Sequence, residues 1–237
     1  MIKTNYFVMT LMLAATLSLA PASTPSRAGS PQDDLKVVLD KMNARASGFA
    51  KAKADFEWVV YTAVVKQSDI QTGQIYYRRG RNGPDSDAIA IRVVSPAQKH
   101  IVVADGKFKM YEPKLDQNTE RALGKDRAEY EQAMRLGFGS RGSELLASFE
   151  VKLLGWETVD GVNTAKLELI PTVPSYQKAF QKVFFWIDTD RDIALKQQFF
   201  QASGDYRLVH NTNIDLKSTP PNDAFAIEHG HNKVVIH

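Results

Sequence analysis

The fold is decided by a stretch in which two apolar runs flank a two-residue turn, His100-Ile101-Val102-Val103-Ala104-Asp105-Gly106-Lys107-Phe108-Lys109-Met110-Tyr111-Glu112-Pro113. The Asp-Gly pair is the strongest short-range signal of a β-hairpin, because both turn residues adopt a positive φ. A second pair of this kind, Asp160-Gly161, separates the apolar runs 151–159 and 162–170. The two hairpins predict a sheet in which neighbouring strands run antiparallel.

Alternating apolar and polar residues predict further strands on both sides of the hairpins. They cover residues 56–64, 73–79, 89–93, 182–188, 193–201 and 206–216. Helical spacing of apolar residues over 31–52, with Asp33 and Asp34 in the first turn, predicts an N-terminal helix. Residues 127–148 break the strand pattern and predict two short lid helices, joined by the glycine-rich segment 137–142.

These elements predict an α+β fold. We expect a curved antiparallel sheet, a half-barrel of about 9–11 strands, with the N-terminal helix and the short lid helices over its apolar concave face. Helices this small cover only part of so wide a sheet, which predicts an apolar cavity for a ligand. An ordinary α+β core with a completely filled face is the alternative.

The first 28 residues have the pattern of a secretory signal peptide. Lys3 provides the positive start, residues 6–20 are apolar, and small residues follow, with cleavage expected after Ala22 or Ala28. Removal of residues 1–28 takes away Lys3 and Arg27 and lowers the net charge from +3 to +1. We expect one domain over residues 29–225, followed by a loose C-terminal tail over 226–237.

Charge and motif content argue against several classes of function. A near-neutral chain does not suit nucleic acid, which needs many cations on one face. Cysteine is absent, which excludes disulfides and an N-terminal lipid anchor. No nucleophile motif of a hydrolase occurs, so we predict no enzyme and no cofactor. We also predict no specific metal site, and the role of His229, His231 and His237 near the C-terminus stays open.

Arg79 does not fit a simple apolar face. Strict alternation places it on the same side of its strand as Ile75 and Tyr77. An arginine there needs partners for its five donors, or a place at the rim. It can extend to the sheet edge or pair with a carboxylate. The functional hypothesis is that Arg79 donates to backbone carbonyls of the lid and keeps the cavity closed.

The chain resembles the outer-membrane lipoprotein carrier family, the LolA-like proteins of the LolA/LolB fold superfamily. The resemblance rests on Gly73-Gln74-Ile75-Tyr76-Tyr77-Arg78-Arg79, on Val103-Ala104-Asp105-Gly106 with Tyr111 and Pro113, and on Pro220-Pro221 with Ala224-Phe225. It implies a strand over 117–121 and places Arg79 at the family's lid-contacting arginine. The polar loop 80–87 departs from the family pattern, so Arg78 and Arg92 are alternatives for that role.

The resemblance implies a periplasmic carrier that holds acyl chains of lipoproteins, or another lipid, and shuttles them from the inner to the outer membrane. Its implied partners are an inner-membrane ATP-driven lipoprotein transporter and an outer-membrane lipoprotein receptor, and we expect a soluble monomer. A lipid- or lipoprotein-sensing regulatory domain is the alternative, and an envelope protein with a filled core is a third. The predicted cavity lining is Trp58, Val60, Tyr77, Ile91, Val93, Phe108, Met110, Leu167 and Phe185.

Overall fold

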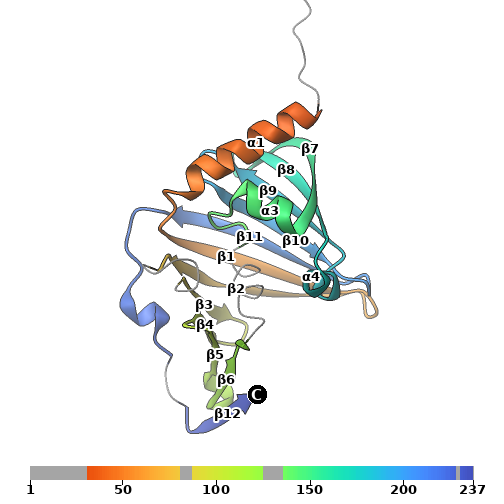
Figure 1. Ribbon diagram of the computed structural model, residues 1–237. Coiled ribbons are helices and arrows are strands. Elements are labelled where there is room, and N and C mark those ends of the chain that lie inside the picture. Colours follow the sequence, from red (N-terminus) through yellow and green to blue (C-terminus); the bar gives the residue numbers. More distant parts are fainter. Residues whose placement is uncertain (1–30, 81–86, 125–135, 228–229, 237) are drawn as a thin grey trace, which may run out of the picture.

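A single sheet of twelve strands organises the protein (Figure 1). The computed structural model describes residues 31–80, 87–124, 136–227 and 230–236. The strands are β1 (Lys51–Thr62), β2 (Gln67–Arg78), β3 (Ala88–Ser95), β4 (Lys99–Ala104), β5 (Lys107–Glu112), β6 (Gln117–Ala122), β7 (Phe149–Val159), β8 (Val162–Pro171), β9 (Lys182–Asp188), β10 (Ile193–Phe200), β11 (Tyr206–Asp215) and β12 (Asn232–Ile236). The helices are α1 (Pro31–Ala46), α3 (Gly142–Ser148) and α4 (Pro174–Ala179), with 3-10 turns η2 (Pro113–Leu115) and η4 (Asn222–Phe225).

The strand order is β12-β6-β5-β4-β3-β2-β1-β11-β10-β9-β8-β7. All neighbours pair antiparallel except β12, which lies parallel to β6. The pairing of β1 with β11 joins the first half of the chain to the second. The sheet is open, and the predicted α+β fold with a curved sheet is confirmed.

Both predicted hairpin turns are present. Asp105 and Gly106 have φ values of 53° and 69°, and Asp160 and Gly161 have 49° and 78°. All four lie in the region that the tightest hairpin turns require. The strand implied by the resemblance over 117–121 is β6.

Two sequence predictions need correction. The N-terminal helix ends at Ala46 and not at residue 52, because the chain turns at Gly48 and Lys51 already pairs with Arg78 in the sheet. The C-terminal tail is not loose, because residues 232–236 form β12 along the free edge of β6. An ion pair between Lys233 and Glu120 supports this strand at 3.0 Å. Predicted domain boundaries at residues 28 and 225 stay predictions.

The helices cover one part of one sheet face. In Figure 1, α1 and α3 lie against the strands β7 to β10, and α4 lies at the far end of the same strands. The core beneath them contains Val38 and Met42 from α1, Leu145 from α3, and the sheet residues Leu167 and Phe185. None of the helices in the described part of the chain has the length and hydropathy needed to cross a membrane.

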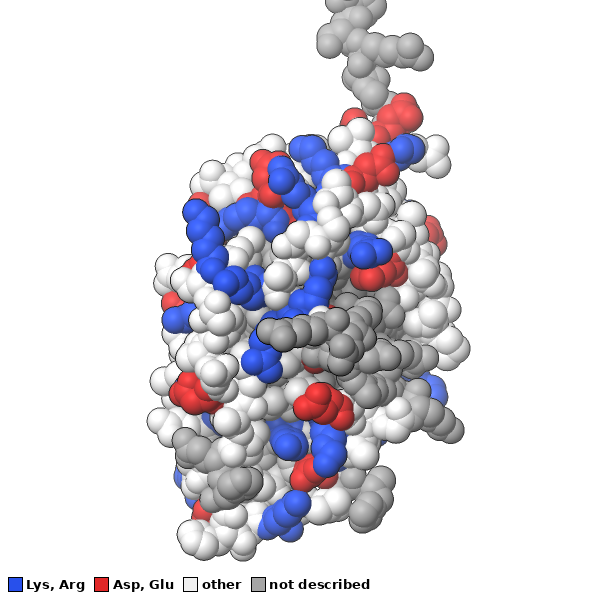
Figure 2. Space-filling model, turned by 60° about the vertical axis from the view of Figure 1, so that its left-hand side comes forward, with Lys and Arg blue, Asp and Glu red and all other residues white. Residues whose placement is uncertain are grey.

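A second core cluster fills the centre of the sheet. It joins Phe49, which follows α1, to Phe56 and Ile91 on the sheet and to Phe138. Basic and acidic side chains are interspersed over the face that Figure 2 shows. This mixture fits the small net charge of +3.

Candidate functional site

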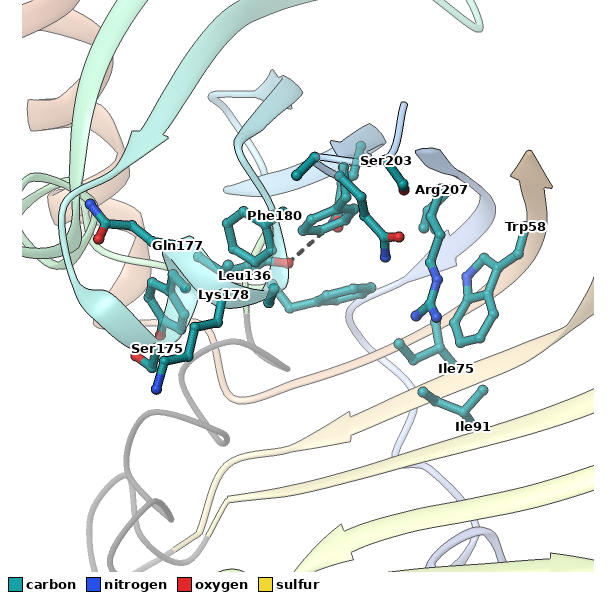
Figure 3. Close-up of a pocket in the computed structure, with 18 of the residues that line it drawn as sticks. Trp58, Ile75, Ile91, Leu136, Ser175, Gln177, Lys178, Phe180, Ser203 and Arg207 are labelled. Carbon is teal, nitrogen blue, oxygen red and sulfur yellow. Dashed lines mark hydrogen bonds between the residues drawn. The ribbon is translucent and has the colours of Figure 1, made fainter. Parts of the chain in front are cut away.

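A cavity of about 1010 Å³ opens between the centre of the sheet and α4 (Figure 3). Its volume lies at the upper end of the range for ligand pockets. The described residues that line it come from the sheet, from the segment before α3, and from α4 with the β10–β11 turn: Trp58, Ile75, Ile91, Gln197, Phe199, Arg207, Val209 and Asn211; Leu136 and Phe138; and Ser175, Tyr176, Gln177, Lys178, Ala179, Phe180, Gln201, Ala202 and Ser203.

One row of side chains runs from the cavity into the covered core. Trp58 pairs with Val209, Val209 with Gln197, and Gln197 with Phe185 in the strand register. Paired residues in a sheet point to the same face. The first three line the cavity, whereas Phe185 is fully buried in the core beneath the helices. The cavity is therefore the part of this face that α1 and α3 leave uncovered.

The segment before α3 crosses the same face. The backbone nitrogen of Ala194 donates to the carbonyl of Gly137 at 2.8 Å, and that of Gly139 donates to the carbonyl of Asp192 at 3.0 Å. A Cβ on Gly139 would lie 2.4 Å from the ring of Phe49, so only glycine allows this close approach. Of the two predicted lid helices, α3 is present, and the residues of the earlier one lie mostly outside the described part of the chain.

Asp192 is a buried carboxyl beneath this segment. Its side chain is 2% exposed, and neither carboxylate oxygen has a hydrogen-bond partner among the described residues. Burial, with a smaller contribution from Glu144, raises the pKa of Asp192 from 3.8 to about 7, and Arg79 opposes this rise. The carboxyl therefore exchanges its proton near neutral pH.

Two of the predicted lining residues, Trp58 and Ile91, line the cavity. Phe108 and Met110 pair with Val103 and Ile101 and lie farther along the same face, half-buried and away from the cavity. Val60 follows Trp58 on this face but is not among the lining residues.

The other four predicted lining residues are packed in the core. Leu167 and Phe185 are fully buried under α1, and Val93 belongs to the central cluster. Tyr77 packs on Phe49, with ring centroids 5.4 Å apart, and donates its hydroxyl to Asp87 at 2.7 Å. Burial, together with this carboxylate, raises the pKa of Tyr77 to about 12.

Arg79 was predicted to contact the lid segment 127–148. In the structure it contacts the end of α1 instead. Its guanidinium donates to the carbonyl of Ala46 at 2.9 Å and to that of Ser47 at 3.4 Å, at the C-terminal end of α1. Its described hydrogen bonds do not include the predicted lid segment 127–148. A cation at this position also suits the negative end of the helix dipole. A role for Arg79 in closing a lid stays a prediction.

The two alternative arginines lie elsewhere. The guanidinium of Arg78 lies 4.4 Å from the ring centroid of Phe225. Arg92 donates to the carbonyl of Asp223 at 2.7 Å. Both side chains therefore hold η4 against the sheet. Among the described residues, neither forms a hydrogen bond or an ion pair with α1 or α3.

Neither α4 nor the aromatic residues around it were predicted from the sequence. Phe180 and Phe199 pack edge to face, 5.6 Å apart between ring centroids, and both line the cavity. Pro174 at the start of α4 and the spacing of Tyr176 and Phe180 were the available signals of a short amphipathic turn.

The C-terminal histidines are only partly described. His231 lies 2.6 Å from Asp116 between Nδ1 and Oδ2, whereas His229 and His237 lie outside the described residues. Within the described part of the chain, no group of three side chains is arranged to hold a metal ion.

Known proteins resemble this chain in fold but not in sequence. No family model and no curated protein sequence matches this chain. The solved structure of MucB is 14% identical and aligns with a TM-score of 0.53 over 83% of this chain and 63% of MucB. This chain therefore spans less than two thirds of MucB. MucB has also been solved in complex with MucA(peri).

An uncharacterized conserved protein from Thermus thermophilus aligns with a TM-score of 0.53, at 11% identity, over 86% of this chain and 99% of that protein. A LolA superfamily protein from Nitrosomonas europaea is also among the structural matches, at 14% identity and a TM-score of 0.36, over 78% of this chain and 94% of that protein. At such low sequence identities the similarity shows only a shared fold. The two alignments with a TM-score of 0.53 support this conclusion.

Proposed function

We propose that the protein is a periplasmic carrier that binds acyl chains of a lipoprotein or another lipid in the cavity on the concave face. The observation that carries this proposal is the apolar floor of the cavity, formed by Trp58, Ile75, Ile91, Phe199 and Val209. Each methylene buried there contributes about 0.8 kcal/mol, so a long acyl chain gains enough to bind firmly. The activity is binding and transfer, without bond breaking.

Transfer requires that the cargo also be released. If the empty protein is stabilised by contacts between the covering helices and the sheet, cargo binding must offset them, which lowers affinity. Arg79 makes such a contact at the end of α1. We therefore expect Arg79→Leu to retain cargo more tightly, and unchanged release to acceptor vesicles would contradict this role. An inner-membrane ATP-driven transporter and an outer-membrane receptor are the proposed partners.

Native mass spectrometry of the protein, purified from a periplasmic fraction without detergent, tests the proposal. Bound material is then extracted and identified. We expect adducts that carry acyl chains, either acylated peptides or lipids. A bare mass, together with failure to take up added acyl chains, would reject the carrier function and favour an envelope protein whose sheet face is simply covered.

A regulatory domain is the second candidate. The likeness to MucB favours it, because MucB forms a complex with another protein, MucA. Such a domain would bind lipid and change its affinity for a protein partner. A transfer assay separates the two functions, because only a carrier delivers its cargo to acceptor membranes.

A further inference from the structure

The described charged residues that line the cavity have one sign. Among the described residues that line it, Lys178 and Arg207 are the charged ones, and none is Asp or Glu. Figure 3 shows the guanidinium of Arg207 next to the indole of Trp58 and above Ile75, with Lys178 on α4 across the cavity. The apolar floor therefore meets two cations at its rim.

The strand register places Arg207 on the concave face. It pairs with Phe199 on β10 and with Val60 on β1. Asp69 follows Val60 in the same row, on β2, but forms no ion pair with Arg207. Within the described part of the chain, neither the Arg207 nor the Lys178 side chain has a hydrogen-bond or ion-pair partner. Both cations are available to a ligand.

An arginine in this setting favours one kind of ligand group. Its guanidinium stays charged at all physiological pH values and presents paired donors that match a carboxylate or a phosphate. Arg207 is exposed at the rim, so an anionic head group can reach it while an acyl chain lies on the apolar floor beside it. Gln201 and Ser203 at the same rim provide additional hydrogen-bonding groups.

We propose that the ligand of this cavity is an amphiphile with an anionic head group, a carboxylate or a phosphate. Its acyl chain lies on the floor formed by Trp58, Ile91 and Val209, and its head group binds Arg207, with Lys178 contributing from the opposite rim. The inference rests on the proposed function and narrows it, because acyl-chain burial alone does not distinguish charged from neutral lipids.

Competition with a neutral fluorescent probe, N-phenyl-1-naphthylamine, tests the inference on the delipidated protein. The competitors are palmitate, hexadecanol and lysophosphatidic acid, at about pH 8, where a carboxylic acid is ionised. We expect the anionic competitors to displace the probe at about ten-fold lower concentration than hexadecanol. Comparison of palmitate with lysophosphatidic acid shows whether carboxylate or phosphate is preferred.

Variants assign the preference to the cations. We expect Arg207→Gln to remove most of the preference, because palmitate and lysophosphatidic acid should then displace the probe at concentrations close to that of hexadecanol. Lys178→Gln should reduce it less. Lys196→Gln is the control, because Lys196 lies on the opposite face, against the ring of Trp186.

The outcomes distinguish failure of the inference from failure of the proposed function. Equal displacement by hexadecanol and palmitate in the unchanged protein would overturn the inference and leave the carrier proposal standing. A preference that survives the double variant of Arg207 and Lys178 would overturn the assignment to these residues. Absence of any binding, of probe or competitors, would overturn both.

Discussion

Asp192 is a carboxyl whose folded environment opposes its charge. It is buried without a hydrogen-bond partner in the described structure, near Glu144. Because its pKa is about 7 in the folded protein and 3.8 ordinarily, the folded state holds a proton that the unfolded state has lost between these values. Asp192 therefore lowers the stability as the pH rises from about 4 to about 7.

The variant Asp192→Asn tests this sign. Asparagine keeps the shape, tolerates the positive φ of 55°, and stays neutral. We expect it to raise the free energy of unfolding at about pH 8 by roughly 2 kcal/mol or more, and to change it little at about pH 4. Urea unfolding at both pH values measures the difference. Asp105→Asn, at an exposed turn residue with a φ of 53°, is the control. A gain that is equal at both pH values would contradict the burial argument.

Arg79 is expected to stabilise the end of α1. The variant Arg79→Leu removes the donors to the carbonyls of Ala46 and Ser47 and should lower the free energy of unfolding by about 1–2 kcal/mol. Arg78→Leu should cost less, because it removes only a surface contact with the Phe225 ring. Urea denaturation compares the two variants. Equal losses in the free energy of unfolding would contradict a specific stabilising role of the Arg79 contacts at the end of α1.

At the scale of elements, Gly73 allows β2 and β3 to meet at an irregular register. A Cβ at this position would lie 1.9 Å from the carbonyl oxygen of Arg92 and 2.9 Å from the ring of Phe56. Backbone on one side and a packed ring on the other leave no room for relaxation. We expect Gly73→Ala to destabilise the protein by about 1–3 kcal/mol in thermal or urea unfolding.

Gly48 provides the matched control for this prediction. A Cβ there has the carbonyl oxygen of Arg45 as its nearest described neighbour, at 3.7 Å, which is an ordinary contact. Gly48→Ala should therefore change stability by no more than about 0.5 kcal/mol. A comparable loss in both variants would point to backbone flexibility and not to the β2–β3 approach.

Element prediction from the sequence succeeded where the pattern is local. The Asp105-Gly106 and Asp160-Gly161 turns and the strand 182–188 follow from turn chemistry and alternation. It failed where tertiary contacts decide. α1 ends at Ala46 because the chain turns at Gly48 and the next strand begins to pair at Lys51, and β12 forms because β6 offers an unpaired edge.

Across the whole molecule, the sequence identified the faces of the strands better than it identified the site. Phe185 and Leu167 do share a face with Trp58, as the alternation predicts. Which part of that face is covered depends on where α1, α3 and α4 pack, and strand alternation carries no information on this. The cavity therefore includes Phe180 and Phe199 and excludes Tyr77 and Val93.

The claim that this cavity holds acyl chains is tested most directly by probe uptake in two adjacent variants. Val209 faces the cavity, whereas Leu208 points to the other face of β11, and both are half-buried. Titration with N-phenyl-1-naphthylamine should show saturable binding in the unchanged protein and in Leu208→Trp. The indole in Val209→Trp occupies part of the cavity floor, where the acyl chain would lie, and should weaken binding about ten-fold or more at unchanged unfolding temperature. Equal binding by both variants would contradict the account.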